Sequence, residues 1–367
     1  MRLEPFGRVS GARIPRADTH RSLAAMAAAV IIAAACAGPG ASPTPGGSPA
    51  GSPGQTTPAA SPTEAITYPE SPITFVVPFA AGGPTDTVTR LVAEPMSKAL
   101  GQQIIVSNVV GAGGTKAAGE VAQAAPDGYT VLMHHIGMST APSLYKDLPY
   151  DPLVDFKTIG LVTEVPMTIV GKKDLPPTTL QELVDYVKTN GDKVKYAHAG
   201  VGAASQLCGL LFQSEVGTKV TEVPYNGTGP ALQDLVGGQV DFLCDQTTST
   251  TPQIKAGAVK AYAITSAERN AALPDLPTTT EAGLPDVQVT VWHGLYVPKD
   301  TPDAIVAKLT EALKLALKDQ NVIAKFADLG TTPVPEDRVT PEAHRAHLQA
   351  QIEFWKPIIE AAGVTVP

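Results

Sequence analysis

Short runs rich in β-branched residues alternate with longer amphipathic runs from Ile73 onward. The first series reads strand, helix, strand, helix, strand, at residues 73–77, 85–100, 104–106, 115–124 and 130–134. Period-two runs that alternate with helical periodicity indicate βαβ units. The series therefore predicts a parallel sheet covered by helices.

The same alternation returns in the middle of the chain. It predicts helices at 180–190, 205–216, 230–237 and 251–256, and strands at 195–197, 220–223, 240–243 and 260–265. Two sheets are easier to build from this pattern than one. Extended segments near Ile169 and Ile264 flank the central set, so we expect a first lobe made of 68–170 and 267–367, and a second lobe of 171–266. Two chain crossings would then form a hinge.

Two further helices are predicted late in the chain. Residues 304–318 form a strongly amphipathic stretch, with Asp300 or Thr301 as the expected cap and Pro302 near the start. The last helix is expected at 341–362.

An export signal is predicted at the start of the chain. Five arginines precede an apolar run at 23–35, which ends at Cys36. A permanent transmembrane helix needs about 20 apolar residues, so we expect residues 1–35 to be cleaved. Three alanines before Cys36 favour lipidation of that cysteine, with plain cleavage as the alternative. Residues 37–63 are almost all Gly, Ala, Ser, Pro and Thr, so 36–67 are expected to form a lipid-anchored, disordered tether.

The charge of the chain excludes one class of partner. The whole chain is formally −8, and the five arginines against Glu4 and Asp18 give +3 before Cys36, which leaves −11 for the remainder. Nucleic-acid binding depends on a basic footprint, so we expect none. An anionic ligand stays possible, because local dipoles in a cleft decide its binding.

A glycine turn follows the first predicted strand and leads directly into a helix. It contains Gly82 and Gly83, followed by Thr85 and Asp86 as the expected capping residues. The first amides of a helix have no partner within it and attract anions. A second glycine loop, 111–114, precedes Thr115 after the next strand. Ligands of open α/β sheets bind beyond the carboxyl ends of the strands, so we expect both helix starts to face one anion.

Other polar residues fall at predicted strand ends, where turn chemistry alone could place them. They are Gly137 and Ser139, then Gly200, Gly202 and Ser205, then Thr228 and Gly229, and finally Asp245, Gln246 and Thr247. Their shared topological position is the reason to consider them as ligand contacts.

No motif for catalysis, nucleotides or metals is found. The loops lack the P-loop and dinucleotide patterns, and no Gly-x-Ser-x-Gly elbow occurs. His134 and His135 should face opposite ways on a strand, and His344 and His347 are expected on a solvated helix face. We expect no catalytic residue, no metal and no cofactor.

Two cysteines are left once Cys36 is assigned to export. Cys208 and Cys244 are expected to form a disulfide in an oxidising compartment. The alternative is two small buried residues without a bond.

From Tyr68 to its end, the chain resembles the receptors of tripartite tricarboxylate transporters, the Bug-type periplasmic solute-binding proteins. The matching positions are spread in order over the folded body: Tyr68-Pro69, Pro72-Ile73, 76–86, 111–114, 125–130, Val223-Pro224-Tyr225, 237–241, Leu276-Pro277-Thr278, Glu281-Ala282-Gly283 and Trp292-His293-Gly294-Leu295.

The resemblance implies an α/β, two-lobed periplasmic-binding-protein-like fold (type II), with mainly parallel sheets flanked by helices. It implies that the lobes close over a small carboxylate, either a di- or tricarboxylate or an aromatic one. It also implies an extracytoplasmic location and delivery of the ligand to a membrane permease; we expect a monomer. The implied ligand contacts are Phe79, Ala80, Ala81, Gly82, Gly83, Thr85, Asp86, Gly113, Gly114, Thr115, Ser139, Gly202, Ala203, Ser205, Thr228 and Asp245.

Two positions depart from the family pattern. Ala203 stands where the family often has Ser, and Gln206 where it often has His, so a hydroxyl is missing from the second-lobe wall. Cys208 and Cys244 match a subgroup that carries both cysteines, which favours the disulfide. Alternatives to the transport receptor are a ligand-sensing subunit of a signalling system and a hydrolase acting on carboxylated substrates.

Overall fold

The computed structural model of the protein describes residues 67–365. The expected signal peptide, the Cys36 anchor and the tether lie outside these residues, except for Thr67. Among the described helices, none combines the length and the apolar character that crossing a membrane requires.

The first lobe is built on the predicted parallel strands. β1 (Ile73–Val77) lies between β2 (Ile104–Asn108) and β3 (Thr130–His135) and is parallel to both. β9 (Thr290–Pro298) extends this sheet antiparallel to β3, and β4 (Phe156–Lys172) pairs antiparallel with β9. The prediction of β1 is confirmed residue by residue, while β2 and β3 run slightly further than expected.

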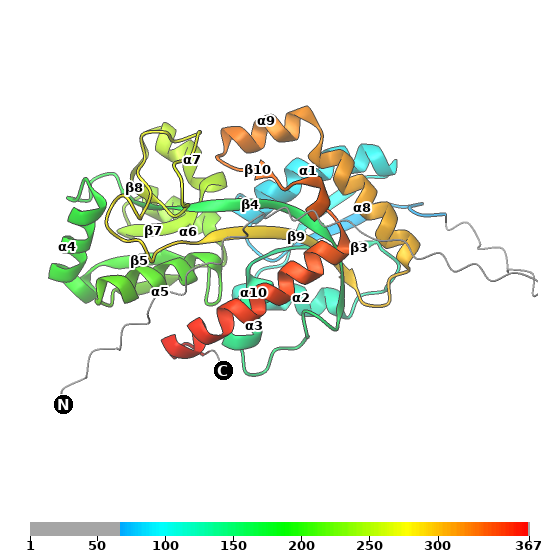
Figure 1. Ribbon diagram of the computed structural model, residues 1–367, viewed down its shortest axis with the longest axis horizontal. Coiled ribbons are helices and arrows are strands. Elements are labelled where there is room, and N and C mark those ends of the chain that lie inside the picture. Colours follow the sequence, from blue (N-terminus) through cyan, green and yellow to red (C-terminus); the bar gives the residue numbers. More distant parts are fainter. Residues whose placement is uncertain (1–66, 366–367) are drawn as a thin grey trace, which may run out of the picture. The chain divides into compact units, whose positions relative to one another are not determined.

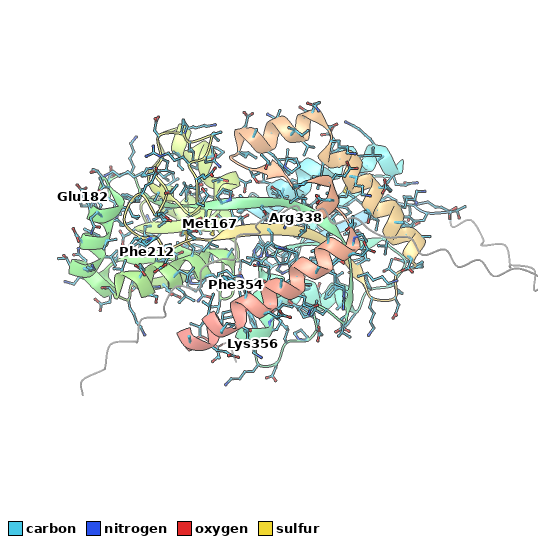
Figure 2. The ribbon with its side chains drawn as sticks, in the orientation of Figure 1. Met167, Glu182, Phe212, Arg338, Phe354 and Lys356 are labelled. Carbon is cyan, nitrogen blue, oxygen red and sulfur yellow. A yellow bond between two sulfur atoms is a disulfide. The ribbon has the colours of Figure 1, made fainter. Side chains whose placement is uncertain are left out.

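One long strand passes from the first lobe into the second. Residues 156–166 of β4 pair with β9, and 167–172 pair with β7 (Phe242–Gln246) and β8 (Val259–Ile264). Met167 marks this change of partner near the middle of the strand (Figures 1 and 2). β5 (Lys195–His198) is parallel to β7 and to β6 (Thr221–Pro224), so the strand order is β2-β1-β3-β9-β4-β7-β5-β6.

The expected two-lobed α/β fold is confirmed. The strands do not form two separate sheets, as the repeated pattern had suggested, because β4 pairs with β9 in the first lobe and with β7 and β8 in the second and so joins them into one mixed sheet. The exact lobe boundaries at 170 and 266 stay a prediction, and β4 runs through the first of them.

Most predicted helices are found within a few residues of their expected bounds. The α-helices are α1 (Pro84–Leu100), α2 (Thr115–Ala122), α3 (Gly137–Leu144), α4 (Leu180–Asn190), α5 (Ala204–Val216), α6 (Thr228–Val236), α7 (Thr247–Lys255), α8 (Asp303–Leu317), α9 (Gln320–Asp328) and α10 (Pro341–Ala362). Short 3-10 turns lie at Ala112–Gly114, Gly191–Lys193 and Glu336–Arg338, and the short strand β10 (Thr332–Pro333) pairs with β4. α3 and α9 were not predicted.

Two of the predicted helix caps are wrong. The N-cap of α8 is Pro302, and neither Asp300 nor Thr301 caps it. The N-cap of α1 is Gly83, with Pro84 as the first helical residue, so Thr85 and Asp86 lie inside the first turn. Proline is common at the first helical position, because its fixed φ suits a helix and it has no amide that needs a partner.

The apolar face of α1 packs into the core of the first lobe. Val88, Val92 and Met96 follow each other at a spacing of four and are fully buried. α8 packs against α1 and also against β4. This packing fixes the start of α1 at the carboxyl end of β1, where the functional site lies.

A disulfide between Cys208 and Cys244 joins α5 to β7. Their Cα atoms are 6.1 Å apart, within the usual range for a bridge. The expected pairing is thereby confirmed. Since Ser205 precedes Cys208 by one helical turn and Asp245 follows Cys244 directly, the bridge ties two polar positions together.

Replacing both bridging cysteines by alanine should lower the free energy of unfolding by about 2–4 kcal/mol, because the bridge closes a loop that is flexible in the unfolded chain. Urea denaturation under non-reducing conditions measures the difference. Adding a reductant should destabilise the wild-type protein but leave the double variant unchanged. Equal stability of both proteins without reductant would contradict the prediction.

Candidate ligand-binding site

A small cavity lies between the two lobes. It has eleven lining residues: Phe79, Pro84, Thr85, His135, Ala199, Ala203, Ala204, Ser205, Thr228, Asp245 and Gln246. Because both lobes contribute to its lining, opening or closing of the lobes changes the space that it offers a ligand.

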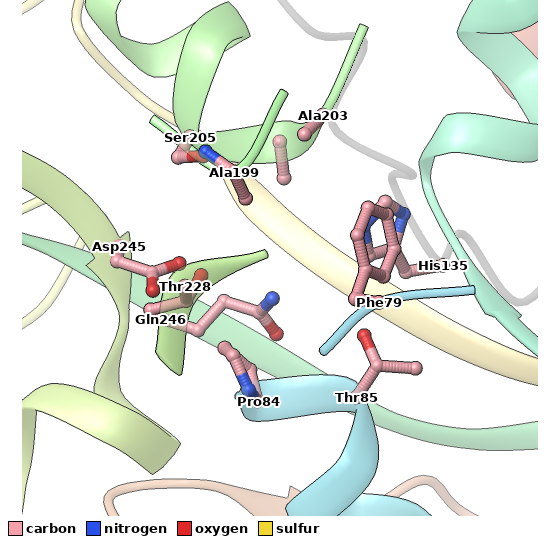
Figure 3. A pocket seen from close by; sticks show the side chains of 11 residues that line it. Phe79, Pro84, Thr85, His135, Ala199, Ala203, Ser205, Thr228, Asp245 and Gln246 are labelled. Carbon is pink, nitrogen blue, oxygen red and sulfur yellow. The ribbon is translucent and has the colours of Figure 1, made fainter. Parts of the chain in front are cut away.

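Four helices present their starts to this cavity. Thr85 is the second residue of α1, Ser205 the second of α5, Thr228 the first of α6, and Gln246 the N-cap of α7. Figure 3 shows Pro84 and Thr85 entering from α1, with Asp245, Thr228 and Gln246 on another side. Each helix start carries a partial positive charge, so the cavity favours an anion. No lysine or arginine is among the lining residues.

Thr85 forms the first-lobe side of the site. The amides of Thr85 and Asp86 have no carbonyl one turn earlier in α1, because the helix begins at Pro84. The Thr85 hydroxyl lies 3.3 Å from Nε2 of His293, a fully buried residue of β9. Burial lowers the pKa of His293 to about 3, so this ring is neutral. His293 thus orients the hydroxyl without adding charge.

Asp86 holds the glycine turn in place. Its carboxylate accepts hydrogen bonds from the Gly82 amide at 3.0 Å, Arg90 Nε at 2.9 Å and Asn108 Nδ2 at 3.0 Å. Burial raises the pKa of Asp86, but these bonds outweigh it, and the net result is a lowered pKa. The Gly82 amide is consequently used within the first lobe. Neither Gly82 nor Asp86 lines the cavity.

The second lobe contributes polar groups that have no partner. Asp245 is 1% exposed, and its Oδ2 makes no hydrogen bond to any described residue. Burial raises the pKa of Asp245 to about 7. Oε1 of Gln246 is also buried without a partner among residues 67–365. The Ser205 hydroxyl accepts the Ala199 amide at 2.8 Å, so its own proton stays available.

One side of the cavity is apolar and aromatic. The rings of Phe79 and His135 stack with centroids 4.6 Å apart, and Phe79 packs with Ala199 and Ala203. Ala203 is where the sequence lacks the hydroxyl common in the family, and it does leave an apolar patch there. This side of the cavity therefore favours contact with a nonpolar part of a ligand.

The structure corrects the expected arrangement of the adjacent histidines. The rings of His134 and His135 lie 5.1 Å apart instead of on opposite faces. β3 ends at His135, and the following turn lets the Gly137 amide donate to His135 Nδ1 at 2.9 Å. The strand alternation that the prediction assumed therefore breaks at this position. Within residues 67–365, no group of three or more potential ligands is arranged to hold a metal ion.

Several predicted ligand contacts lie outside the lining of the cavity. Among these, the hydroxyls of Ser139 and Thr115 donate to Ile136 O at 2.7 Å and Ala112 O at 2.9 Å. The Gly202 amide donates to Gln206 Oε1 at 2.7 Å. The others are Ala80, Ala81, Gly82, Gly83, Asp86, Gly113 and Gly114. As direct ligand contacts, all of these stay a prediction.

Five lining residues were absent from the predicted site: Pro84, His135, Ala199, Ala204 and Gln246. Each is adjacent in sequence to a lining residue or follows a predicted strand. Gln246 had been noted at a strand end, but the start of α7 had been expected later, near Thr251. Nothing in the sequence marked His135 as a lining residue, because its position in the cavity depends on where β3 ends.

The two lobes meet tightly on either side of the cavity. The Ala80 amide donates to Asn226 O across the lobes at 3.0 Å. A Cβ atom added to Gly229 would lie 2.7 Å from Ala81 O, and one added to Gly113 would collide with Val201 O. These glycines allow backbone to approach backbone. The structure is accordingly a closed one.

Two sequence comparisons with known proteins bear on the family of this chain. A family described as the tripartite tricarboxylate transporter family receptor matches residues 88–364. A UPF0065 protein from Agrobacterium vitis, encoded in the TAR-I ttuE-ttuC' intergenic region, is 55% identical over 81% of this chain and 86% of the relative.

The chain belongs to the tripartite tricarboxylate transporter receptor family. Two solved Bug-type structures have the same fold. The periplasmic binding protein BugD is 48% identical, with a TM-score of 0.80, over 82% of this chain and 100% of BugD. MatC from Rhodopseudomonas palustris with bound malate is 45% identical, with a TM-score of 0.77, over 80% of this chain and 100% of MatC.

A tyrosine links the lobes of this family member beside the cavity. The Tyr145 hydroxyl lies 2.8 Å from both Ala112 O and Val201 O. Burial raises the pKa of Tyr145 to about 12, so the hydroxyl keeps its proton. One proton serves one carbonyl at a time, and the bond to Val201 exists only when the lobes are closed.

Changing Tyr145 to Phe should shift the equilibrium toward the open form by about 2–10-fold, the effect of one hydrogen bond. Small-angle X-ray scattering of the ligand-free protein should then give a larger radius of gyration. Tyr129→Phe is a matched control, since the Tyr129 hydroxyl contacts only Glu70 in the first lobe. An identical scattering profile for Tyr145→Phe and wild type would count against this role.

The histidines of α10 also differ from their predicted setting. His344 is fully buried, with its ring 4.5 Å from that of Tyr296 and 5.9 Å from that of Trp292. His347 is half-buried, with its ring 5.0 Å from that of Trp292. The expectation of a solvated face was wrong because Gly294 on β9 leaves room for the His344 ring.

Acid should destabilise the fold through its buried histidines. Burial lowers the pKa of His134 to about 4, and of His293 and His344 to about 3. Below pH 6.5 these histidines bind protons in the unfolded chain but stay neutral in the folded chain. Each of them therefore lowers the free energy of unfolding by about 1.4 kcal/mol per pH unit. Asp245 has the opposite effect, because its pKa is raised in the folded chain. Between about pH 7 and pH 4, acidification increases its contribution to the free energy of unfolding by the same amount per pH unit.

The balance of three histidines against one aspartate predicts a net loss of about 3 kcal/mol or more between pH 7 and pH 5. Urea denaturation monitored by circular dichroism at several pH values measures it. A free energy of unfolding that stays constant over this range would show that these rings titrate normally.

Proposed function

We propose that this protein is an extracytoplasmic receptor that binds a small carboxylate by closing two lobes over it and delivers it to a membrane permease. One observation carries the proposal: the starts of α1, α5, α6 and α7 converge on a small cavity that contains no cationic side chain. Such a cavity binds an anion through backbone and hydroxyl donors. No chemical step is required of it.

Binding would draw on donors from both lobes. The amide of Thr85 and the hydroxyls of Thr85, Ser205 and Thr228 are placed to contribute. A charge-assisted hydrogen bond contributes about 1.5–3 kcal/mol, so four of them contribute about 6–12 kcal/mol, a range that includes the roughly 8 kcal/mol of micromolar binding. Because the donors come from both lobes, the ligand stabilises the closed state.

The comparisons support the kind of ligand and the place of action. The MatC structure contains malate, and BugD is described as periplasmic. The predicted signal at 1–35 and the cysteine at position 36 support export followed by lipid anchoring. A lipid anchor would keep the receptor next to its permease at the membrane surface.

Gly113→Ala should weaken carboxylate binding at least tenfold, because its Cβ would collide with Val201 O and hold the lobes apart. Gly82→Ala is the matched control. Both glycines have positive φ, +60° and +78°, but a Cβ at Gly82 meets no atom within 4 Å. Local strain is thus similar in the two variants, and only one of them blocks closure.

The measurement is a thermal-shift screen of wild type and both variants against benzoate, succinate, malate and citrate. A ligand at a hundredfold excess over its Kd stabilises the wild type by about 2.7 kcal/mol. We expect Gly113→Ala to lose this stabilisation and Gly82→Ala to retain most of it. Absence of any shift in the wild type would refute the proposed function.

A further inference from the structure

Asp245 is the one carboxyl group among the described residues that line the cavity, and one of its oxygens makes no hydrogen bond to them. It is the fourth residue of β7, directly before the N-cap of α7. Figure 3 shows its carboxyl group across the cavity from Phe79 and His135. With 1% exposure and an Oδ2 that has no described partner, it is buried and aimed at the ligand space.

No positive charge is available to balance an ionised Asp245. The titratable side chains that face it are His135, across the cavity, and Tyr196, on the adjacent strand β5. Burial lowers the pKa of His135 well below its usual value and raises that of Tyr196, so both groups are neutral.

The other elements packed against β7 offer only neutral groups at this point. β4 contributes Thr168, whose hydroxyl contacts the backbone carbonyl of Asp245 at 3.4 Å. α5, α6 and α7 contribute Ser205, Thr228 and Gln246. The neighbouring Cys244 is in a disulfide and does not titrate.

A ligand with two carboxylates would therefore place its second negative charge near Asp245. Thr85 from the first lobe and Asp245 from the second line the same cavity, so a ligand that reaches from one lobe to the other contacts both walls. Two carboxylates that share a buried site cannot both stay ionised, and one proton comes to lie between them.

We propose that Asp245 receives the second carboxylate of the ligand as a neutral acid, its O–H donating to that carboxylate, so that one proton enters with a dicarboxylate. This inference rests on the proposed function and adds a residue that sets specificity within the same site. Protons and charge balance in this step: protonated Asp245 bound to the dianion forms from ionised Asp245, one proton from water and the dianion. No covalent bond of the ligand changes.

The titration of Asp245 supports this assignment. Burial raises its pKa to about 7, so the neutral acid is already well populated near neutral pH. Protonation of Asp245 on binding then costs little free energy. A nearby anionic carboxylate raises the pKa further, which is the physical origin of the proton uptake.

Calorimetry with succinate between pH 6 and pH 9 tests the inference in the wild-type protein. Titrations in two buffers with different ionisation enthalpies should show uptake that approaches one proton per succinate above pH 7. The affinity should fall about tenfold per pH unit there, because binding then requires a proton from solution. This part of the test needs no variant.

Asp245→Asn provides the second arm, since an amide donates a hydrogen bond at every pH. At pH 8.5 this variant should bind succinate at least tenfold more tightly than the wild type and show no proton uptake. Asp234→Asn is the control: Asp234 lies in the same lobe, but its carboxylate accepts from Tyr225 at 2.6 Å and does not line the cavity. Its pH dependence should match that of the wild type.

The outcomes separate this inference from the proposed function. Succinate binding without proton uptake, together with weaker binding by Asp245→Asn at pH 8.5, would mean that an ionised Asp245 accepts a donor from the ligand, and would overturn the inference alone. Binding of benzoate but of no dicarboxylate would do the same. If benzoate, succinate, malate and citrate all fail to bind at pH 6, the receptor function falls, and this inference with it.

Discussion

The close approach of two backbones across the cavity is the constraint on which the functional site depends. Gly113 faces Val201, and Gly229 faces Ala81, at distances that leave no room for a side chain. Glycine loops at strand ends usually suggest a backbone that wraps an anion. In this protein the same loops mainly let one lobe lie against the other, and the anion site forms in the space between them.

The candidate site has no lysine or arginine among its lining residues, yet four helix starts favour an anion there. Its positive potential comes from helix starts, and the nearby histidines His134, His135 and His293 are buried and neutral. Such a cavity has no cationic side chain that would retain a bound anion after the lobes open. Release then depends on opening, which breaks contacts with both walls at once.

Much of the fold could be predicted from the sequence, because the hydrophobic pattern of each segment determines whether that segment forms a strand or a helix. The strand at 73–77 and the helices 180–190 and 341–362 match β1, α4 and α10 at both ends. The site was predicted in part for the same reason: Thr85, Ser205 and Asp245 follow strands, and strand ends converge in an α/β sheet. What could not be predicted depends on tertiary packing. The position of His135 follows from where β3 ends, and the contact of Gly113 with Val201 depends on lobe closure.

The disulfide gives the two walls of the cavity different freedom. It joins α5 to β7 and so fixes Ser205 relative to Asp245 within the second lobe. Thr85, in contrast, belongs to α1 in the first lobe, so its distance from this wall changes when the lobes open or close. A rigid wall that is organised before binding loses little entropy when the ligand arrives, so it favours specificity. The distance to which the first lobe can close against this rigid wall would then limit the length of the ligand that fits.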